Sequence, residues 1–475
     1  MKKNKILFRV DGNAQIGLGH VVRCIALAQM LNDAFEIVFV SKEIPSQTVE
    51  ELKSNNFKLY QDQDEPAFFN RINNEAIVVL DGYHFDTGFQ KKVRATGAKL
   101  VCIDDLHDME FVADLIINHA PGVFPRDYRA QLYTQFALGL DYVLLRPLFL
   151  RQAKHTRTIT RVDTVLICFG GADPKNLTRQ TLETVLNTAT FKKIIVVTGA
   201  AYLHASGIKT LTNNNAGIEH YSAVGEAEML ALMLEADLAI VPSSGILFEV
   251  MAAGCKIISG YYANNQEILF NRLKSAGAFI AAGNFDKADI ESAIEKAKKN
   301  EKPPLKLIDG KSGKNILRSF FHISTSLRKA AYADCELIFN WANDRTVRAN
   351  AFNPKPIAFQ EHKNWYDNKL KDARCHIFIL SLQGADAGQI RFDTVEDIAF
   401  ISYLIDKDFR GLGLGSLIVS KAIDSMKAEN KARRFVALVK LSNGASIKVF
   451  QRLGFAQKAE NHPEYGNIYS FSLEL

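Results

Sequence analysis

The stretch Ile6-Leu-Phe-Arg-Val-Asp-Gly-Asn-Ala-Gln-Ile-Gly-Leu-Gly-His20 decides the fold of the first half of the chain. Its first residues are apolar and typical of a buried strand, and apolar residues return at helical spacing from Val21 to Leu31. Glycine permits a tight turn and a close approach of the backbone to a ligand, so Gly17 and Gly19 fit a loop between the two elements. We therefore predict a strand, a glycine loop and a helix whose first turn carries His20.

A histidine at that position is a candidate general base. The positive end of the helix dipole favours the neutral imidazole, which is the form that accepts a proton near neutral pH. The alternative is that His20 only caps the helix. The glycine loop in front of it favours the catalytic interpretation.

The same order of strand, loop and helix recurs in Val165-Leu-Ile-Cys-Phe-Gly-Gly-Ala-Asp-Pro-Lys-Asn176. Here Asp173 is predicted to cap a helix that has Pro174 at its first position. The exposed amides of such a turn suit a diphosphate. The alternative is an ordinary turn between a strand and a helix.

A third loop follows the apolar run Leu238–Val241. Ser243 and Ser244 can donate hydrogen bonds to a phosphate, and Glu249, about one turn into the next helix, can accept them from ribose hydroxyls. Gly254 is the expected C-terminal stop of that helix. A capped helix with a solvated Glu249 is the alternative.

Short apolar runs alternate with amphipathic stretches as far as residue 320, which is typical of parallel strands covered by helices on both faces. We predict α/β architecture with two Rossmann-like parallel-sheet domains, residues 1–150 and 151–322, and a ligand cleft between the carboxyl ends of their sheets. Residues 323–475 change to a mixed α+β pattern. The predicted strands of the first two domains are Ile6–Val10, Ile37–Val40, Ile77–Leu80, Leu100–Ile103, Val165–Phe169, Ile194–Val197 and Leu238–Val241.

The composition excludes several classes of protein. The 475 residues are 47% apolar and 23% charged, as in ordinary globular proteins, and the net charge is +6 without a basic stripe that would suit nucleic acid. No apolar run approaches the length of a membrane helix, and the first one is too short for a signal peptide, so we expect a cytoplasmic protein without membrane insertion. The six cysteines are far apart, which favours structural thiols over disulfides or zinc.

The loop motifs resemble a known family, the UDP-sugar hydrolases of pseudaminic acid biosynthesis (the PseG family). The resemblance covers about residues 5–320, and it implies the two-domain architecture of GT-B glycosyltransferases. It is carried by the glycine loop with Arg9, Asp11 and Arg23-Cys24 around it, by Gly170-Gly171-Ala172-Asp173, by Ser243-Ser244 with Glu249, and by Asn265-Gln266-Glu267.

This resemblance implies hydrolysis of UDP-2,4-diacetamido-2,4,6-trideoxy-β-L-altropyranose, with inversion at the anomeric carbon and with water activated by His20. No metal is implied, so amides and basic groups would stabilise the leaving diphosphate. Gly82 stands where some relatives have histidine, so the sugar side of the pocket is expected to differ. The residues predicted to bind the UDP-sugar are Asp11, Gly17, Gly19, Arg23, Tyr83, Gly170, Gly171, Asp173, Ser243, Ser244, Glu249, Asn265 and Gln266.

A second glycine loop, Arg410-Gly-Leu-Gly-Leu-Gly-Ser416, lies between a predicted strand, Ala399–Asp406, and a helix. Together with Asn443-Gly-Ala-Ser446 and Leu453-Gly-Phe455 it resembles the GNAT acetyltransferases over about residues 324–475. The resemblance implies that loop amides hold the pyrophosphate of acetyl-CoA and that Asn443 and Ser446 approach its pantetheine arm. The predicted acetyl-CoA residues are Arg410, Gly411, Leu412, Gly413, Leu414, Gly415, Ser416, Asn443 and Ser446.

One position departs from the GNAT pattern. Many relatives have a tyrosine that protonates the departing thiolate where this chain has Phe450. Another group then acts, or the thiolate leaves unassisted. Glu396, Ser402 and Tyr403 are candidates on the acceptor side, although each also fits an ordinary sheet or surface residue.

In the pseudaminic pathway, acetylation of a 4-amino group precedes removal of UDP, so the fusion predicts that one chain performs both steps. The alternatives are the same architecture acting on another UDP-amino sugar of a legionaminic-type route, a GT-B glycosyltransferase, or a module that only binds UDP-sugar beside a GNAT domain of separate specificity.

Overall fold

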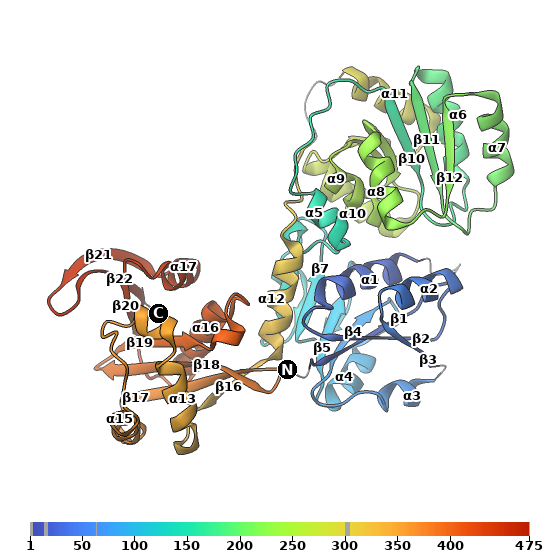
Figure 1. Cartoon of the computed structure of the whole chain (residues 1–475). Coiled ribbons are helices and arrows are strands. Elements are labelled where there is room, and N and C mark those ends of the chain that lie inside the picture. The colour runs from blue at the N-terminus through green and yellow to red at the C-terminus, as the bar shows by residue number, and fades with distance from the viewer. Residues whose placement is uncertain (1–2, 14–17, 63, 300–304, 475) are drawn as a thin grey trace. The chain divides into compact units, whose positions relative to one another are not determined.

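The computed structural model describes residues 3–13, 18–62, 64–299 and 305–474 (Figure 1). The chain forms two compact units, Lys3–Ser319 and Phe320–Leu475, and helix α12 (Ser312–Ser324) contains the boundary. The first unit consists of two lobes, each built on its own sheet. Within the described ranges, no helix is both long and apolar enough to cross a membrane.

The first lobe is a parallel sheet whose first strand in the sequence lies inside the sheet, third from one edge. Val10 pairs with Asp81 and Asp81 pairs with Ile103, so three adjacent strands end side by side. Helix α1 (Gly19–Leu31) follows β1. The sheet order is β3 (Lys58–Gln61), β2 (Glu36–Ser41), β1 (Lys5–Val10), β4 (Ile77–Asp81), β5 (Lys99–Ile103), β7 (Leu115–Asn118) and β9 (Gln135–Leu138).

The second lobe repeats this design around β10 (Thr164–Cys168), which lies between β11 (Lys193–Thr198) and β13 (Leu238–Pro242). Helix α9 (Gly245–Ala253) follows β13 and ends at Gly254, whose φ of +76° is the left-handed conformation that glycine adopts readily. The remaining strands are β12 (Ile218–Ser222) at one edge and β14 (Lys256–Gly260) and β15 (Ile280–Ala281) at the other.

The second unit is a mixed sheet with helices on it. Strands β19 (Ile398–Ile405) and β20 (Arg434–Lys440) run parallel but pair only from Ile398–Arg434 to Phe400–Val436. The carboxyl halves of these two strands therefore separate. The full order is β16 (Thr325–Lys329), β17 (Cys375–Leu382), β18 (Ala385–Val395), β19, β20, β22 (Gly466–Glu474) and β21 (Ala456–His462).

The predicted fold class, two parallel-sheet domains followed by an α+β domain, is confirmed, and so are the seven predicted strands. The strands that the prediction omitted lie mostly at sheet edges. Lys58–Gln61 and Ile218–Ser222 are partly exposed and rich in polar residues, so they lack the continuous apolar run that marks a central parallel strand.

Candidate functional site

The first candidate site lies at the carboxyl edge of the sheet in the first lobe. Parallel strands end on the same edge, so residues that follow β1, β4 and β5 come together there. His20 and Arg23 come from the first turns of α1, Asp81 ends β4, and Asp105 follows β5. Residues from three distant segments of the sequence thus form one cluster.

His20 is paired with the fully buried carboxylate of Asp81, with 2.7 Å between His20 Nδ1 and Asp81 Oδ1. Burial alone would raise the pKa of Asp81, but the charge of Arg23 and hydrogen bonds from Arg23 and His20 outweigh it and lower the pKa to about 2. An ionised carboxylate only accepts hydrogen bonds, so Nδ1 is the donor and Nε2 of a neutral His20 keeps its lone pair. The N-cap residue of α1 is Leu18, and His20 lies inside the helix, so the interpretation of His20 as a capping residue is wrong.

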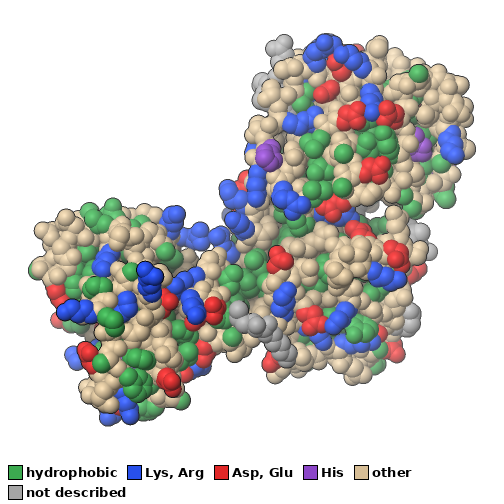
Figure 2. All heavy atoms as spheres, in the orientation of Figure 1, with side chains coloured by type: hydrophobic (Ala, Val, Ile, Leu, Met, Phe, Trp, Pro, Cys, Tyr) green, Lys and Arg blue, Asp and Glu red, His purple; other side chains and the backbone are tan. Residues whose placement is uncertain are grey.

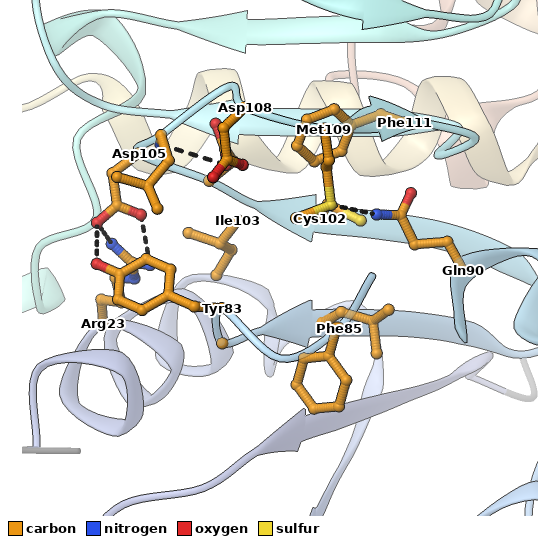
Figure 3. Close-up of a pocket in the computed structure, with 14 residues that line it drawn as sticks. Arg23, Tyr83, Phe85, Gln90, Cys102, Ile103, Asp105, Asp108, Met109 and Phe111 are labelled. Carbon is orange, nitrogen blue, oxygen red and sulfur yellow. Dashed lines mark hydrogen bonds and ion pairs between the residues drawn. The ribbon is translucent and has the colours of Figure 1, made fainter. Parts of the chain in front are cut away.

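Arg23 holds two carboxylates in place. Its guanidinium donates to Asp81 Oδ2 at 2.7 Å and Oδ1 at 2.6 Å, and to the two oxygens of Asp105 at 3.1 and 3.2 Å. Tyr83 donates its hydroxyl to Asp105 at 3.2 Å, and its ring stands edge-on to His20 with 4.9 Å between centroids. Figure 3 shows Arg23, Tyr83 and Asp105 converging on one side of this cluster.

Next to this cluster is a small pocket under the loop that follows β4. Its volume is about 50 Å³. The polar side is formed by Arg23, Tyr83 and Asp105, and the apolar side by Phe85, Ile103, Met109 and Phe111 (Figure 3). The pocket therefore lies beside the Arg23–Asp105 ion pair, and His20 is not among the residues that line it.

Asp11 was predicted to bind substrate, and its carboxylate is strongly engaged within the protein. It accepts from Arg9 Nη1 and from the backbone amide of Lys42, both at 2.7 Å, and from Ser41 Oγ at 3.1 Å. Burial would raise its pKa, but these bonds and the neighbouring His84 lower it far below the usual range. Asp11 thus fixes the start of the glycine loop, where Gly19 begins α1 and Gly17 lies outside the described residues.

The glycine turn of the second lobe differs from the prediction. Gly170 and Gly171 follow β10 as expected, but α6 (Leu177–Thr188) begins at Leu177, so the prediction of Pro174 as its first residue is wrong. The carboxylate of Asp173 accepts from the amides of Leu177 at 2.9 Å and Thr178 at 2.7 Å. These two amides are therefore occupied by the protein and are not exposed for a diphosphate.

The N-terminus of α9 differs from that of α6, because the side chain of its N-cap residue does not bond the first amides, whereas that of Asp173 does so in α6. Ser244 is its N-cap and makes no side-chain cap, while Ser243 Oγ lies 3.0 Å from Ser259 Oγ. Glu249 is partly buried in the second turn of α9, and burial raises its pKa to about 7 although Arg146 lowers it. In this lobe the amides of α9 are the better candidates for holding phosphate oxygens.

The third sequence motif of this lobe, Asn265-Gln266, lies in the first turn of α10 (Asn264–Ser275). Gln266 Oε1 accepts from the backbone amide of Tyr262 at 3.1 Å, which shapes the turn before the helix. The backbone of Asn265 belongs to the same turn.

The second candidate site lies in the Phe320–Leu475 unit, where β19 and β20 separate. The glycine loop follows β19 and leads into α16 (Leu414–Ala428), with Gly411 and Gly413 both at φ +83°. Asn443 caps α17 (Gly444–Arg452), since its side chain accepts from the amide of Ser446 at 3.2 Å. The N-termini of both helices thus follow the two separating strands.

Several side chains of this site also engage one another. Tyr403 donates to Ser446 Oγ at 3.1 Å, and its ring lies edge-on to the buried Phe450. Arg410 is held by Asp344 at 2.6 Å and by the carbonyl of Ile405 at 3.1 Å, which anchors the start of the loop. Leu412, Leu414, Gly415 and Ser416 form the rest of the loop and the first turn of α16.

The chain is similar to known proteins in both of its parts. Residues 325–456 match the family described as "Acetyltransferase (GNAT) domain". The Campylobacter jejuni protein named UDP-2,4-diacetamido-2,4,6-trideoxy-beta-L-altropyranose hydrolase is 24% identical over 270 residues, which cover 55% of this chain and 93% of that protein. The chain is a PseG-like unit followed by a GNAT domain.

An uncharacterized protein of Methanocaldococcus jannaschii is similar along the whole chain. It is 24% identical over 507 residues, covering 99% of this chain and all of that protein. The spermidine N-acetyltransferase of Vibrio cholerae, solved with CoA and spermine, matches 32% of this chain and 95% of its own, with 17% identity and a TM-score of 0.30. The archaeal relative is consistent with a fusion of the two parts.

The sequence analysis missed two carboxylates of the PseG-like unit, Asp81 and Asp105. A signal for them was present, because each comes at the end of a buried apolar run, Ile77–Leu80 or Leu100–Ile103. Such positions meet at the carboxyl edge of a parallel sheet. The sequence alone did not show which of them pairs with His20.

On the face shown in Figure 2, basic and acidic side chains are interspersed over both lobes of the PseG-like unit. Nowhere in the described ranges do three or more His, Cys, Asp or Glu side chains gather in a group that could hold a metal ion. The hydrogen-bond donors of these sites include backbone amides, Arg23 and hydroxyl groups.

Proposed function

We propose that the PseG-like unit hydrolyses UDP-2,4-diacetamido-2,4,6-trideoxy-β-L-altropyranose to UDP and free sugar, and that the GNAT domain acetylates the 4-amino group of the precursor UDP-sugar with acetyl-CoA in the cytoplasm. The observation that carries the proposal is the pairing of His20 with the buried, ionised Asp81. The activity for which the Campylobacter relative is named and the match to the GNAT family support the two substrates.

In the hydrolytic step, Nε2 of His20 takes a proton from water while Nδ1 keeps its hydrogen bond to Asp81. The resulting hydroxide attacks the anomeric carbon opposite the UDP, so the carbon–oxygen bond breaks and the configuration inverts. The imidazolium is stabilised by Asp81, which Arg23 keeps ionised. UDP leaves with the electron pair, and the amides at the start of α9 are the groups that we assign to its phosphates.

In the acetyl transfer, the amino group of the sugar attacks the thioester carbonyl, the nitrogen gives up one proton to solvent, and the carbon–sulfur bond breaks. CoA leaves as a thiolate that must gain a proton. Burial raises the pKa of Tyr403, so its phenol is protonated at neutral pH and able to donate. With Phe450 in the neighbouring helix, Tyr403 is the strongest of the candidates named from the sequence.

The test is incubation of the full chain with UDP-4-amino-4,6-dideoxy-β-L-AltNAc in ¹⁸O-labelled water, with and without acetyl-CoA, followed by mass spectrometry. We expect acetylated free sugar that carries ¹⁸O, together with unlabelled UDP, and only when acetyl-CoA is present. Label in UDP would show attack at phosphorus and contradict the role given to His20. An unchanged substrate would contradict the choice of sugar.

The same assay separates the alternative functions. A GT-B glycosyltransferase would release UDP only when an acceptor sugar is added, and a binding module would release none. The proposed hydrolysis needs no acceptor other than water. Release of UDP without an added acceptor sugar, and loss of this release in His20→Ala, therefore distinguish a hydrolase from a glycosyltransferase and from a binding module.

A further inference from the structure

A second histidine lies near the catalytic pair and has no role in the step described above. His119 directly follows β7, so it lies at the same carboxyl edge as Asp81 and Asp105. It is partly buried, and the charges of Arg23, Asp105 and Asp81 act on it.

The hydrogen bonding of His119 determines which ring nitrogen carries the proton. The backbone amide of Leu144 donates to Nδ1 at 3.3 Å, so Nδ1 uses its lone pair as an acceptor. Burial, with Arg23 nearby, lowers the pKa of His119 to about 4, and the ring is therefore neutral at pH 7. A neutral imidazole with Nδ1 as acceptor has its proton on Nε2. The hydrogen bond that joins His119 to another described residue is made by Nδ1, and none joins Nε2 to a described residue.

The ring also contacts the second lobe. His119 packs on Phe248 with 4.7 Å between ring centroids, and Phe248 belongs to the first turn of α9. That turn begins with Ser244 and Gly245, the amides that we assign to the phosphates. His119 thus contacts the first turn of α9 and follows a strand of the sheet whose carboxyl edge carries the His20–Asp81 pair.

We propose that His119 donates its Nε2–H to an oxygen of the leaving diphosphate. The inference rests on the proposed hydrolysis and adds a donor for the charge that develops as the anomeric carbon–oxygen bond breaks. A neutral donor performs this task without adding a second cation beside Arg23. The Leu144 amide acts on His119 as a positioning group, because it fixes the tautomer.

The test compares binding of UDP and of uridine to the full chain by calorimetry. His119→Phe keeps a ring that can pack on Phe248 but lacks the donor, and His119→Gln supplies an amide donor instead. His220→Phe is a control, since His220 lies on the edge strand β12 and bonds Thr198 at 2.9 Å. Thermal unfolding of each variant checks that the unit is folded.

We expect His119→Phe to weaken UDP binding about tenfold and to lower kcat for UDP release 10- to 100-fold, while uridine binding stays unchanged. His119→Gln should recover part of both losses, and His220→Phe should lose neither. If His119→Phe weakened the binding of UDP and of uridine equally, His119 would only pack the two lobes together, and the inference would be overturned. Unaltered UDP binding in His119→Phe would also overturn it. Wild-type chain that binds no UDP would overturn the proposed nucleotide site along with it.

Discussion

The pairing of His20 with Asp81 can be tested by a substitution that changes one atom. Asp81→Asn retains the size of the side chain but removes the charge that holds Nδ1–H, so His20 can adopt the other tautomer and lose its basic Nε2. We expect kcat for UDP release to fall about 10²- to 10⁴-fold, with a smaller change in KM. Steady-state kinetics below the unfolding temperature of the variant measure both.

A control variant separates the effect of the charge at this site from the general effect of losing an Asp–Arg ion pair in the same lobe. Asp62 accepts from Arg71 Nε at 2.6 Å in the same lobe, and neither residue belongs to the site. Asp62→Asn should leave kcat unchanged. If both variants lost activity equally, the role of Asp81 would be structural.

Glu249 gives a second prediction, because its position is costly to the folded protein. Its folded pKa of about 7 exceeds the unfolded value of 4.5, so the protein loses stability as pH rises from about 4.5 to 7. Glu249→Gln removes this ionisation and should raise the free energy of unfolding at pH 8 by about 2 kcal/mol, after allowance for solvent screening. At pH 4 the two proteins should be equally stable.

The same variant should bind UDP about tenfold more weakly, because a neutral amide accepts hydrogen bonds from ribose hydroxyls less strongly than a carboxylate does. Thermal unfolding at pH 4 and pH 8 and calorimetry with UDP measure the two effects. A variant that is less stable at pH 8, or that binds UDP as well as wild type, would show that Glu249 is an ordinary helix residue.

At the scale of elements, the glycine loop before α16 can be tested with two side chains of the same shape. Gly413 has φ +83° and is the N-cap of α16. Asn and Asp both tolerate a left-handed backbone, so Gly413→Asn and Gly413→Asp should fold alike. Asp adds a negative charge where the CoA pyrophosphate is proposed to bind, and it should raise KM for acetyl-CoA at least tenfold more than Asn does.

UDP release by the PseG-like unit serves as the internal control for these two variants and should not change. Equal KM values for acetyl-CoA in the Asn and Asp variants would place the pyrophosphate elsewhere. Calorimetry with CoA confirms the difference without turnover.

The elements that could be predicted from the sequence are those in which the local residue pattern matches the burial of the element in the fold. The strand, loop and helix order around Gly19 and around Gly413 was predictable because buried runs, glycines and helical periodicity coincide in each. The start of α6 was mispredicted, since Asp173 bonds amides four and five residues on and so caps the helix from a distance that the usual capping pattern does not include. The pairing of His20 with Asp81 depends on β4 lying next to β1 in the sheet. The local sequence pattern predicts each strand but not which strands are neighbours.

At the scale of the whole molecule, the fusion predicts that each unit works without the other's chemistry. The His20→Asn chain should convert the UDP-amino sugar to its acetylated form and stop there. The Gly413→Asp chain should hydrolyse acetylated UDP-sugar that is supplied to it, but at acetyl-CoA well below its raised KM it should acetylate the amine far more slowly than wild type. Mass spectrometry of each reaction identifies the product at which it stops.

An equimolar mixture of these two chains tests how the intermediate travels. If acetylated UDP-sugar is released to solution and rebound, the mixture should make free acetylated sugar at the rate of wild type carrying the same number of active sites. Covalent linkage raises the local concentration of attached groups, but a released intermediate escapes from it by diffusion. A mixture that forms product much more slowly than wild type, with intermediate accumulating only in the mixture, would show that the intermediate passes directly between the two sites of one chain.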